Sequence, residues 1–170
     1  MVTKRTLLAC MVLVASVATA PLGAAETTTG ITIVGPSRAP VNLSLGELAQ
    51  LPATQVHTDF LTENGPHAAS FEGPLLWTVL QRAGVIDAAK HREQVSQTII
   101  ILGRDGYRAV LALGEIAPEF EAKQVILAER MDGSPLEVEH LRVVVPLDKR
   151  GGRSVRDVAR IEVTTPSPSQ

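Results

Sequence analysis

The sequence predicts an α+β fold: a single compact domain that combines a mixed β-sheet with short helices. Stretches of alternating apolar and polar residues, typical of half-buried strands, recur along the chain and are separated by brief helical patterns. About 145 residues follow an N-terminal leader, which is enough for one domain with a sizeable core. Neither an internal repeat nor an interdomain linker divides this stretch. Strands interspersed with short helices in one unit are typical of the α+β class.

The leader has the order of a secretory signal peptide. Lys4 and Arg5 form a basic start, an apolar run follows, and small residues end it. The apolar run is short for a membrane span. We therefore expect a signal peptide at residues 1–25 and a mature domain at 26–170, with its core at about 31–163 and no membrane span, in the periplasm or secreted. An uncleaved N-terminal anchor is the alternative.

Charge and cysteine content exclude several classes of protein. The chain has 16 Lys and Arg against 18 Asp and Glu, and loss of Lys4 and Arg5 leaves 14 basic residues, a mature net charge of −4. This charge argues against a general binder of nucleic acid or of acidic membranes. The sole cysteine, Cys10, lies in the leader, so the mature domain has neither a disulfide nor a thiolate for a metal.

The first elements of the domain are a strand, a short helix and a second strand. "GITIVG" predicts the first strand. Ser44 and Glu47 have the spacing of a capping box, which opens a helix that Pro52 ends. In "TQVHTDFL", apolar and polar side chains alternate through Val56 and Phe60, as they do in a half-buried strand.

A polar loop and the main helix come next. "TENGPHAAS" predicts the loop, and "FEGPLLWTVLQRAGV" predicts a helix with Pro74 in its first turn. Leu76, Val79 and Leu80 have the spacing of one helical face, and Gly84 suits a left-handed C-cap. We expect Trp77 to be a core anchor of this helix.

Strands dominate the remainder of the chain. "QTIIILGRDGYRAVLAL" predicts two strands joined by a turn at Asp105 and Gly106. "GEIAPEF" predicts a helical turn, and "KQVILAERMDGSPL" a strand with a turn at Asp132 and Gly133. Two further apolar stretches, "LRVVV" and "RIEV", close the domain.

A group of cations lies between those last two strands. It consists of Lys149, Arg150, Arg153, Arg156 and Arg160. From spacing alone, such a group is a solvated face that discourages pairing between strand edges. It also suits an anion, because an Arg guanidinium presents donors in a fork that matches phosphate oxygens.

The order of these elements resembles the molybdopterin-binding domain of the sulfite-oxidase-like oxidoreductases. The resemblance covers most of the mature chain and rests on "FEGPLLWTVLQRAGV", "GRDGYRAVLALGEI", "VILAERMDGSPL" and "LRVVVP" followed by "GRSVRDVARIEV". It implies that fold, an oxidoreductase class and a molybdopterin cofactor. Family members hold the phosphate of the pterin near the C-terminal end, which the resemblance places at Arg142, Ser154, Val155 and Arg156. It also places Tyr107 near the pocket.

The sequence departs from the family pattern in two places. Catalytic members supply a cysteine thiolate to molybdenum from the loop that reads "TENGPHAAS" here, without a cysteine. Glu139 and His140 stand where the family usually has a Gly-Gly-Pro turn. Catalytic residues and metal ligands are therefore left unassigned. The alternative is a noncatalytic periplasmic binding or partner module, without cofactor, that kept the fold.

Two further groups of polar residues are candidate sites. His57 and Asp59 share one face of a strand, which suits a metal or a proton relay, although a polar strand face explains them better. His67 and Glu63 belong to the loop that replaces the cysteine region. They are candidates for lining a remnant of the pocket, and ordinary loop polarity explains them equally well.

Overall fold

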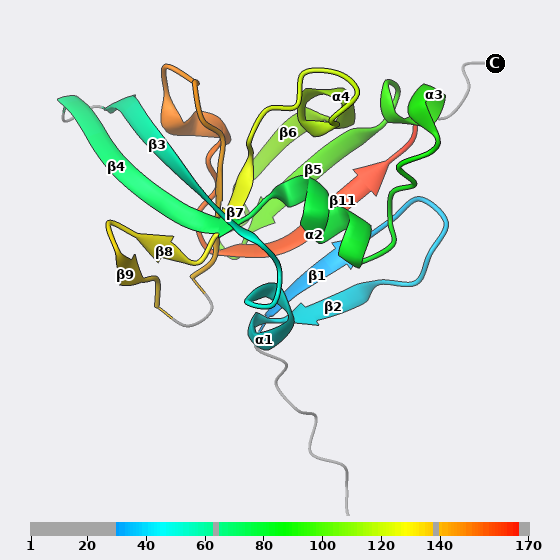
Figure 1. Cartoon of the computed structure of the whole chain (residues 1–170), viewed down its shortest axis with the longest axis horizontal. Coiled ribbons are helices and arrows are strands. Elements are labelled where there is room, and N and C mark those ends of the chain that lie inside the picture. The colour runs from blue at the N-terminus through cyan, green and yellow to red at the C-terminus, as the bar shows by residue number, and fades with distance from the viewer. Residues whose placement is uncertain (1–29, 63–64, 138–139, 167–170) are drawn as a thin grey trace, which may run out of the picture.

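A five-stranded mixed sheet forms one half of the molecule (Figure 1). The computed structural model describes residues 30–62, 65–137 and 140–166, so the expected signal peptide lies outside the described residues. The strand order is β2 (Val41–Ser44), β1 (Gly30–Val34), β11 (Val158–Thr164), β5 (Thr98–Gly103) and β6 (Arg108–Ala112). β1 and β11 pair in parallel and the other neighbours are antiparallel, which confirms the predicted mixed sheet.

A long hairpin and a short strand pair form the other half. β3 (Ala53–Thr62) and β4 (Gly65–Pro74) pair along their whole length and continue into β8 (Arg130–Met131) and β9 (Ser134–Pro135). β7 (Ile126–Ala128) pairs with β10 (Arg142–Val144). The hairpin of β3 and β4 extends away from the five-stranded sheet, and the segment after β10 lies beside it (Figure 1).

The helices are short. They are α1 (Leu45–Leu48), α2 (Leu76–Arg82), α3 (His91–Gln94), α4 (Leu113–Ile116) and the 3-10 turn η1 (Gly151–Arg153). Leu76, Val79 and Leu80 of α2 are fully buried in the main apolar cluster, which also contains Ile33 of β1 and Ile101 of β5. Trp77 is also in this cluster and only 8% exposed, as expected of a core anchor.

Several local predictions are confirmed by the backbone. The Ser44 hydroxyl accepts from the N–H of Glu47, and the Glu47 carboxylate accepts from the N–H of Ser44, which completes the capping box of α1. Gly84 follows α2 with a positive φ of 66°, as a left-handed cap requires. Gly106 has a φ of 83° in the turn between β5 and β6.

The prediction of a polar loop at "TENGPHAAS" is wrong. β4 begins at Gly65, directly across from Thr62 of β3, so this segment is mostly strand. Its polar residues fit a strand because only one face of the hairpin is covered, with Ala69 and Phe71 buried on that face. Pro74 accordingly ends β4, and α2 begins at Leu76 rather than around the proline.

Candidate functional site

A cavity of about 300 Å³ lies where the hairpin sheet meets β10 and the segment before β11. We call it the β10 cavity, and its lining comprises His67, Met131, Leu136, His140, Arg142, Arg156 and Asp157. Cavities of this size are at the lower end of those that hold small ligands in proteins. It brings together Arg142 and Arg156, two of the residues that the resemblance marked.

Arg142 is the first residue of β10, and its guanidinium lies over the ring of Phe71, with 4.9 Å between the guanidinium carbon and the ring centroid. This distance is within the range of a cation–π contact. The Nε atom of Arg142 is buried and has no hydrogen-bond partner among the described residues. A buried donor without a partner costs free energy, more so when the group is charged.

Arg156 brings a second positive charge to the same cavity. Its side chain is exposed and forms no ion pair with any described residue. Burial lowers the pKa of Arg142, and repulsion from Arg156 lowers this pKa further, while Asp157 partly opposes both effects. Two arginines that repel each other, one of them partly desolvated, create a local positive field that an anion would relieve.

His140 and Asp157 form a contact at the edge of the same cavity. Nδ1 of His140 lies 2.6 Å from Oδ1 of Asp157, and Nε2 lies 3.6 Å from the carboxylate of Glu137. The N–H of Val158 donates to the carbonyl of Leu141, which holds the two chain segments side by side. His140 therefore has a fixed place beside the arginines, and its partner carboxylate tempers their field.

Ser154 and Val155 fasten strand β10 and do not line the cavity. The buried hydroxyl of Ser154 accepts from the N–H of Val145 at 3.0 Å, and the carbonyl of Val155 accepts from the N–H of Val143 at 2.9 Å. Both bonds hold the strand that begins with Arg142. The structure gives these two residues a positioning role toward Arg142, by way of the backbone.

The remaining cations of the basic group point to other contacts. Arg153 binds the carboxylate of Asp148 at 2.7 and 2.8 Å and that of Glu115 at 2.9 Å, and the bond to Asp148 leads the effects that raise the pKa of Arg153. Its charge is therefore matched locally by two carboxylates. Arg160 pairs with Glu162, whereas Lys149 and Arg150 are exposed.

The other candidate residues lie apart from the β10 cavity, except His67, which lines it from β4. The Tyr107 hydroxyl donates to the carbonyl of Gly152 at 2.7 Å, so this tyrosine holds η1. His57 and Asp59 are exposed on β3. Glu63 lies outside the described residues. In the described part of the chain, no three His, Cys, Asp or Glu side chains gather as a metal site would require.

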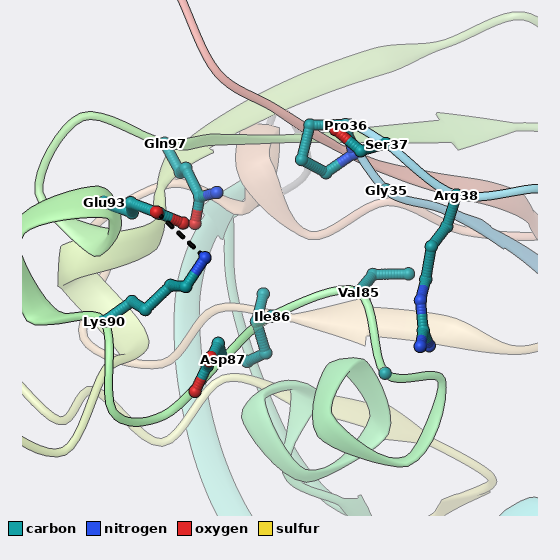
Figure 2. Close-up of a pocket in the computed structure, with 11 residues that line it drawn as sticks. Gly35, Pro36, Ser37, Arg38, Val85, Ile86, Asp87, Lys90, Glu93 and Gln97 are labelled. Atoms are coloured by element: carbon teal, nitrogen blue, oxygen red, sulfur yellow. Dashed lines mark ion pairs between the residues drawn. The ribbon is translucent and has the colours of Figure 1, made fainter.

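A second cavity, of about 210 Å³, lies between the loop after β1 and the segment after α2 (Figure 2). Lys90 and Glu93 form an ion pair at 3.1 Å on one side of this cavity (Figure 2). Arg38 lies on the opposite side (Figure 2), with its guanidinium close to Gly84. The lining of this second cavity offers paired surface charges. The buried polar atoms that lack hydrogen-bond partners among the described residues belong to side chains outside this lining. The β10 cavity is therefore the stronger candidate.

Comparison with known families identifies the class of protein to which this fold and cavity belong. The chain belongs to the oxidoreductase molybdopterin-binding domain family, whose model matches residues 19–170. The fold is sulfite-oxidase-like, as expected. Within the described ranges, no helix combines the length and apolar character needed to cross a membrane.

Among solved structures, the sulfane dehydrogenase SoxCD from Paracoccus pantotrophus is similar, with a TM-score of 0.61 and 18% sequence identity. The match covers 82% of this chain and 39% of that chain, so the present chain spans less than half the length of the SoxCD chain. At this identity the likeness shows a shared fold. No curated protein matches at a significant level.

Sequence reasoning missed the contact between His140 and Asp157. The residues are 17 positions apart and meet only because β10 and the segment before β11 are joined by backbone bonds. Met131 and Leu136 of the cavity wall were also missed, since nothing in the spacing around "RMDGSPL" marks them. The turn at Asp132 and Gly133 was predicted, and it is this turn that brings β8 and β9 together.

Proposed function

We propose that the mature protein is an exported domain that binds the phosphate of a pterin cofactor, or another oxyanion of the same shape and charge, between Arg142 and Arg156. One observation carries the proposal: the half-buried Arg142 has a buried Nε without a partner among the described residues, and it lies beside a second arginine. Its free energy falls when an anion supplies the missing acceptor. Family membership makes the pterin phosphate the natural candidate.

The residues present fit one end of that cofactor better than the other. Arg142 and Arg156 suit the phosphate, and the half-exposed His140 adds a further polar group at the cavity wall. When bound, the cofactor supplies redox chemistry at its metal. The metal end is different, because Cys10 is the sole cysteine of the whole sequence and lies outside the expected mature domain. A thiolate ligand of the kind used by catalytic members is therefore not available from residues 26–170.

The test is a titration of the purified protein with phosphate and with a pterin phosphate, compared across three variants. Arg142→Met removes the charge and keeps an apolar contact with Phe71. Arg156→Met removes the charge at the exposed position. Each is expected to weaken binding by roughly tenfold or more, which corresponds to about 1.4 kcal/mol. Arg150→Met, at an exposed cation that does not line the cavity, is the matched control and loses little.

Stability provides a second reading of the same variants. Without any anion, Arg142→Met is expected to unfold at the same temperature as the native protein or higher, because it removes a desolvated charge and its repulsion with Arg156. If the basic group is only a solvated surface, phosphate binding is expected to be the same in all three variants. Equal losses in all three, or no binding by the native protein at moderate salt, contradict the proposal.

A second candidate function is that of a noncatalytic periplasmic binding or partner module. The observation that favours it is the missing cysteine in "TENGPHAAS", since no other residue type offers an equivalent soft, anionic sulfur. Metal and pterin analysis of the protein purified from its native host separates the two. Stoichiometric pterin with molybdenum supports an enzyme, and pterin or other anion without molybdenum supports a binding module.

A further inference from the structure

A groove of about 480 Å³ runs between β3 and two loop segments, on a different part of the surface from the β10 cavity. One wall is Gln55 to His57 of β3, and the other consists of residues 121–124 together with Pro146 and Leu147. We call it the β3 groove. It shares no lining residue with the β10 cavity, so its role can be tested independently.

The wall formed by β3 is an open strand edge. The N–H of Leu61 donates to the carbonyl of Lys149 at 3.0 Å, so the backbone of Leu61 points away from β4. Backbone direction alternates along a strand, and the register between β3 and β4 is unbroken, so Gln55, His57 and Asp59 point the same way.

The far side of β4 supports this assignment. There the carbonyls of Ser70 and Glu72 accept from Asp132 and Glu129, so the alternate residues of β4 face β3. The outward N–H and C=O groups of Gln55, His57 and Asp59 have no backbone partner in the described part of the chain.

From Ala53 to Asp59, this edge lacks three of the features that commonly discourage pairing with another strand. The stretch from Ala53 to Asp59 contains no Lys and no Pro, and its register shows no bulge. Natural proteins commonly protect open edges with these features, because an unprotected edge is a template for another chain. In the described part of the chain, the backbone bond from Lys149 covers Leu61, at the end of the edge.

Leu147, on the opposite wall, combines two unfavourable features. Its side chain is 90% exposed, and its φ of 68° lies in the left-handed region, which a bulky residue rarely adopts. Neither the exposed apolar surface nor the backbone strain stabilises the isolated domain. Strain retained at a surface position is characteristic of functional sites. An apolar side chain held out over a groove suits a contact with a partner.

We propose that the β3 groove binds an extended peptide segment of a partner protein, which adds as a strand to the open edge of β3 and packs an apolar side chain on Leu147. Main-chain bonds to His57 and its neighbours on the edge supply affinity, and Leu147 with Pro146 selects for an apolar residue. A second copy of this chain is the other occupant that an open edge allows, and the test distinguishes it from a partner peptide.

The probe is a display library of random ten-residue peptides, selected against the full-length protein. Peptides that bind are expected to carry an apolar residue at a common position. They are expected to slow hydrogen exchange at the amides of Gln55, His57 and Asp59, while the amides of β4 stay unchanged. Exchange at these three amides reports strand addition directly, because they point away from β4.

Two variants separate binding from folding. Leu147→Gly relieves the left-handed strain, so its unfolding temperature is expected to stay level or rise while peptide affinity falls at least about tenfold. His57→Pro removes an outward N–H that β4 does not use, and is expected to weaken binding similarly. Arg142→Met, in the other cavity, is the control and keeps native peptide affinity.

Several results overturn the proposal. They are a library that yields no binder, selected peptides that bind Leu147→Gly as well as they bind the native protein, and amides of the β3 edge that exchange at the same rate with and without peptide. Self-association that His57→Pro abolishes also overturns it, since the occupant is then a second copy. Loss of phosphate binding in the Arg142→Met variant has no bearing on these outcomes.

Discussion

Arg142 and Glu129 are charged side chains whose buried polar atoms lack partners among the described residues. They differ in what surrounds them. Arg142 opens onto a polar cavity with a second arginine, where a ligand can supply the missing acceptor. Glu129 borders a smaller cavity lined by apolar side chains such as Leu45 and Leu141. Burial raises the pKa of Glu129, and repulsion from Glu72 raises it further.

The position of Glu129 leads to a prediction about stability and pH. Its carboxyl has a higher pKa in the folded state than in the unfolded state, so folding favours the protonated form. Stability from this group is fully present below the unfolded pKa, about 4.3, and is lost as the pH rises through the folded value. Glu129→Gln, which is neutral at every pH, is therefore expected to raise the unfolding temperature at pH 7 to 8 by about 2 °C or more.

Thermal unfolding between pH 4 and pH 8 provides the measurement. The advantage of Glu129→Gln is expected to shrink as the pH falls and both proteins become neutral at this position. Glu119→Gln, at an exposed position, is the matched control and is expected to show no such trend. An advantage for Glu129→Gln that is constant across this range would contradict the assignment.

At the scale of elements, β10 is the strand on which the site depends. It has only three residues and pairs with β7 on one side, so its position relies on bonds from the segment before β11. The Ser154 hydroxyl and the Val155 carbonyl supply two of them, to the N–H groups of Val145 and Val143. The family resemblance marked both residues as binding the cofactor, whereas the geometry has them holding the strand that carries Arg142.

Ser154→Ala tests that role. It leaves the buried N–H of Val145 without its acceptor, which costs about 1–3 kcal/mol and lowers the unfolding temperature by about 3–10 °C. Phosphate affinity, measured well below that temperature, is expected to stay within about threefold of native, because Ser154 does not line the cavity. Ser96→Ala, which removes an exposed hydroxyl bonded to Glu93, is the control. A tenfold loss of phosphate affinity without loss of stability would place Ser154 in the binding site instead.

The elements differ in how well the sequence predicts them. The α1 capping box, the face of α2 and the turn at Gly106 are local, since each depends on residues within one or two turns of chain. The β4 strand was missed because its polar residues face solvent on one side of a long hairpin, so composition suggested a loop. Only its pairing with β3, over the whole of both strands, explains the strand.

At the scale of the whole molecule, the site is harder to predict than the fold. The order of elements was enough for the family and for a mixed sheet, which the structure confirms. Arg142 and Arg156 were marked by resemblance, and their meeting in one cavity depends on β10, β11 and the hairpin at once. His140 contacts Asp157, and Arg153 binds Asp148 and Glu115. No local sequence pattern predicts these contacts.

The distribution of the core leads to a last prediction, that residues 26–170 fold without any cofactor. The main apolar cluster joins β1, β5, β11 and α2, whereas the β10 cavity lies outside it, beside the smaller cluster around Phe71. Loss of a ligand there leaves the main core intact. Protein made in cells unable to synthesise molybdopterin is therefore expected to unfold in one cooperative transition, and an aggregated or noncooperative product would contradict this expectation. Phosphate at about 100 times its dissociation constant is expected to add about 2.7 kcal/mol of stability. At the same phosphate concentration Arg142→Met, which binds at least about tenfold more weakly, is expected to gain about 1.4 kcal/mol or less.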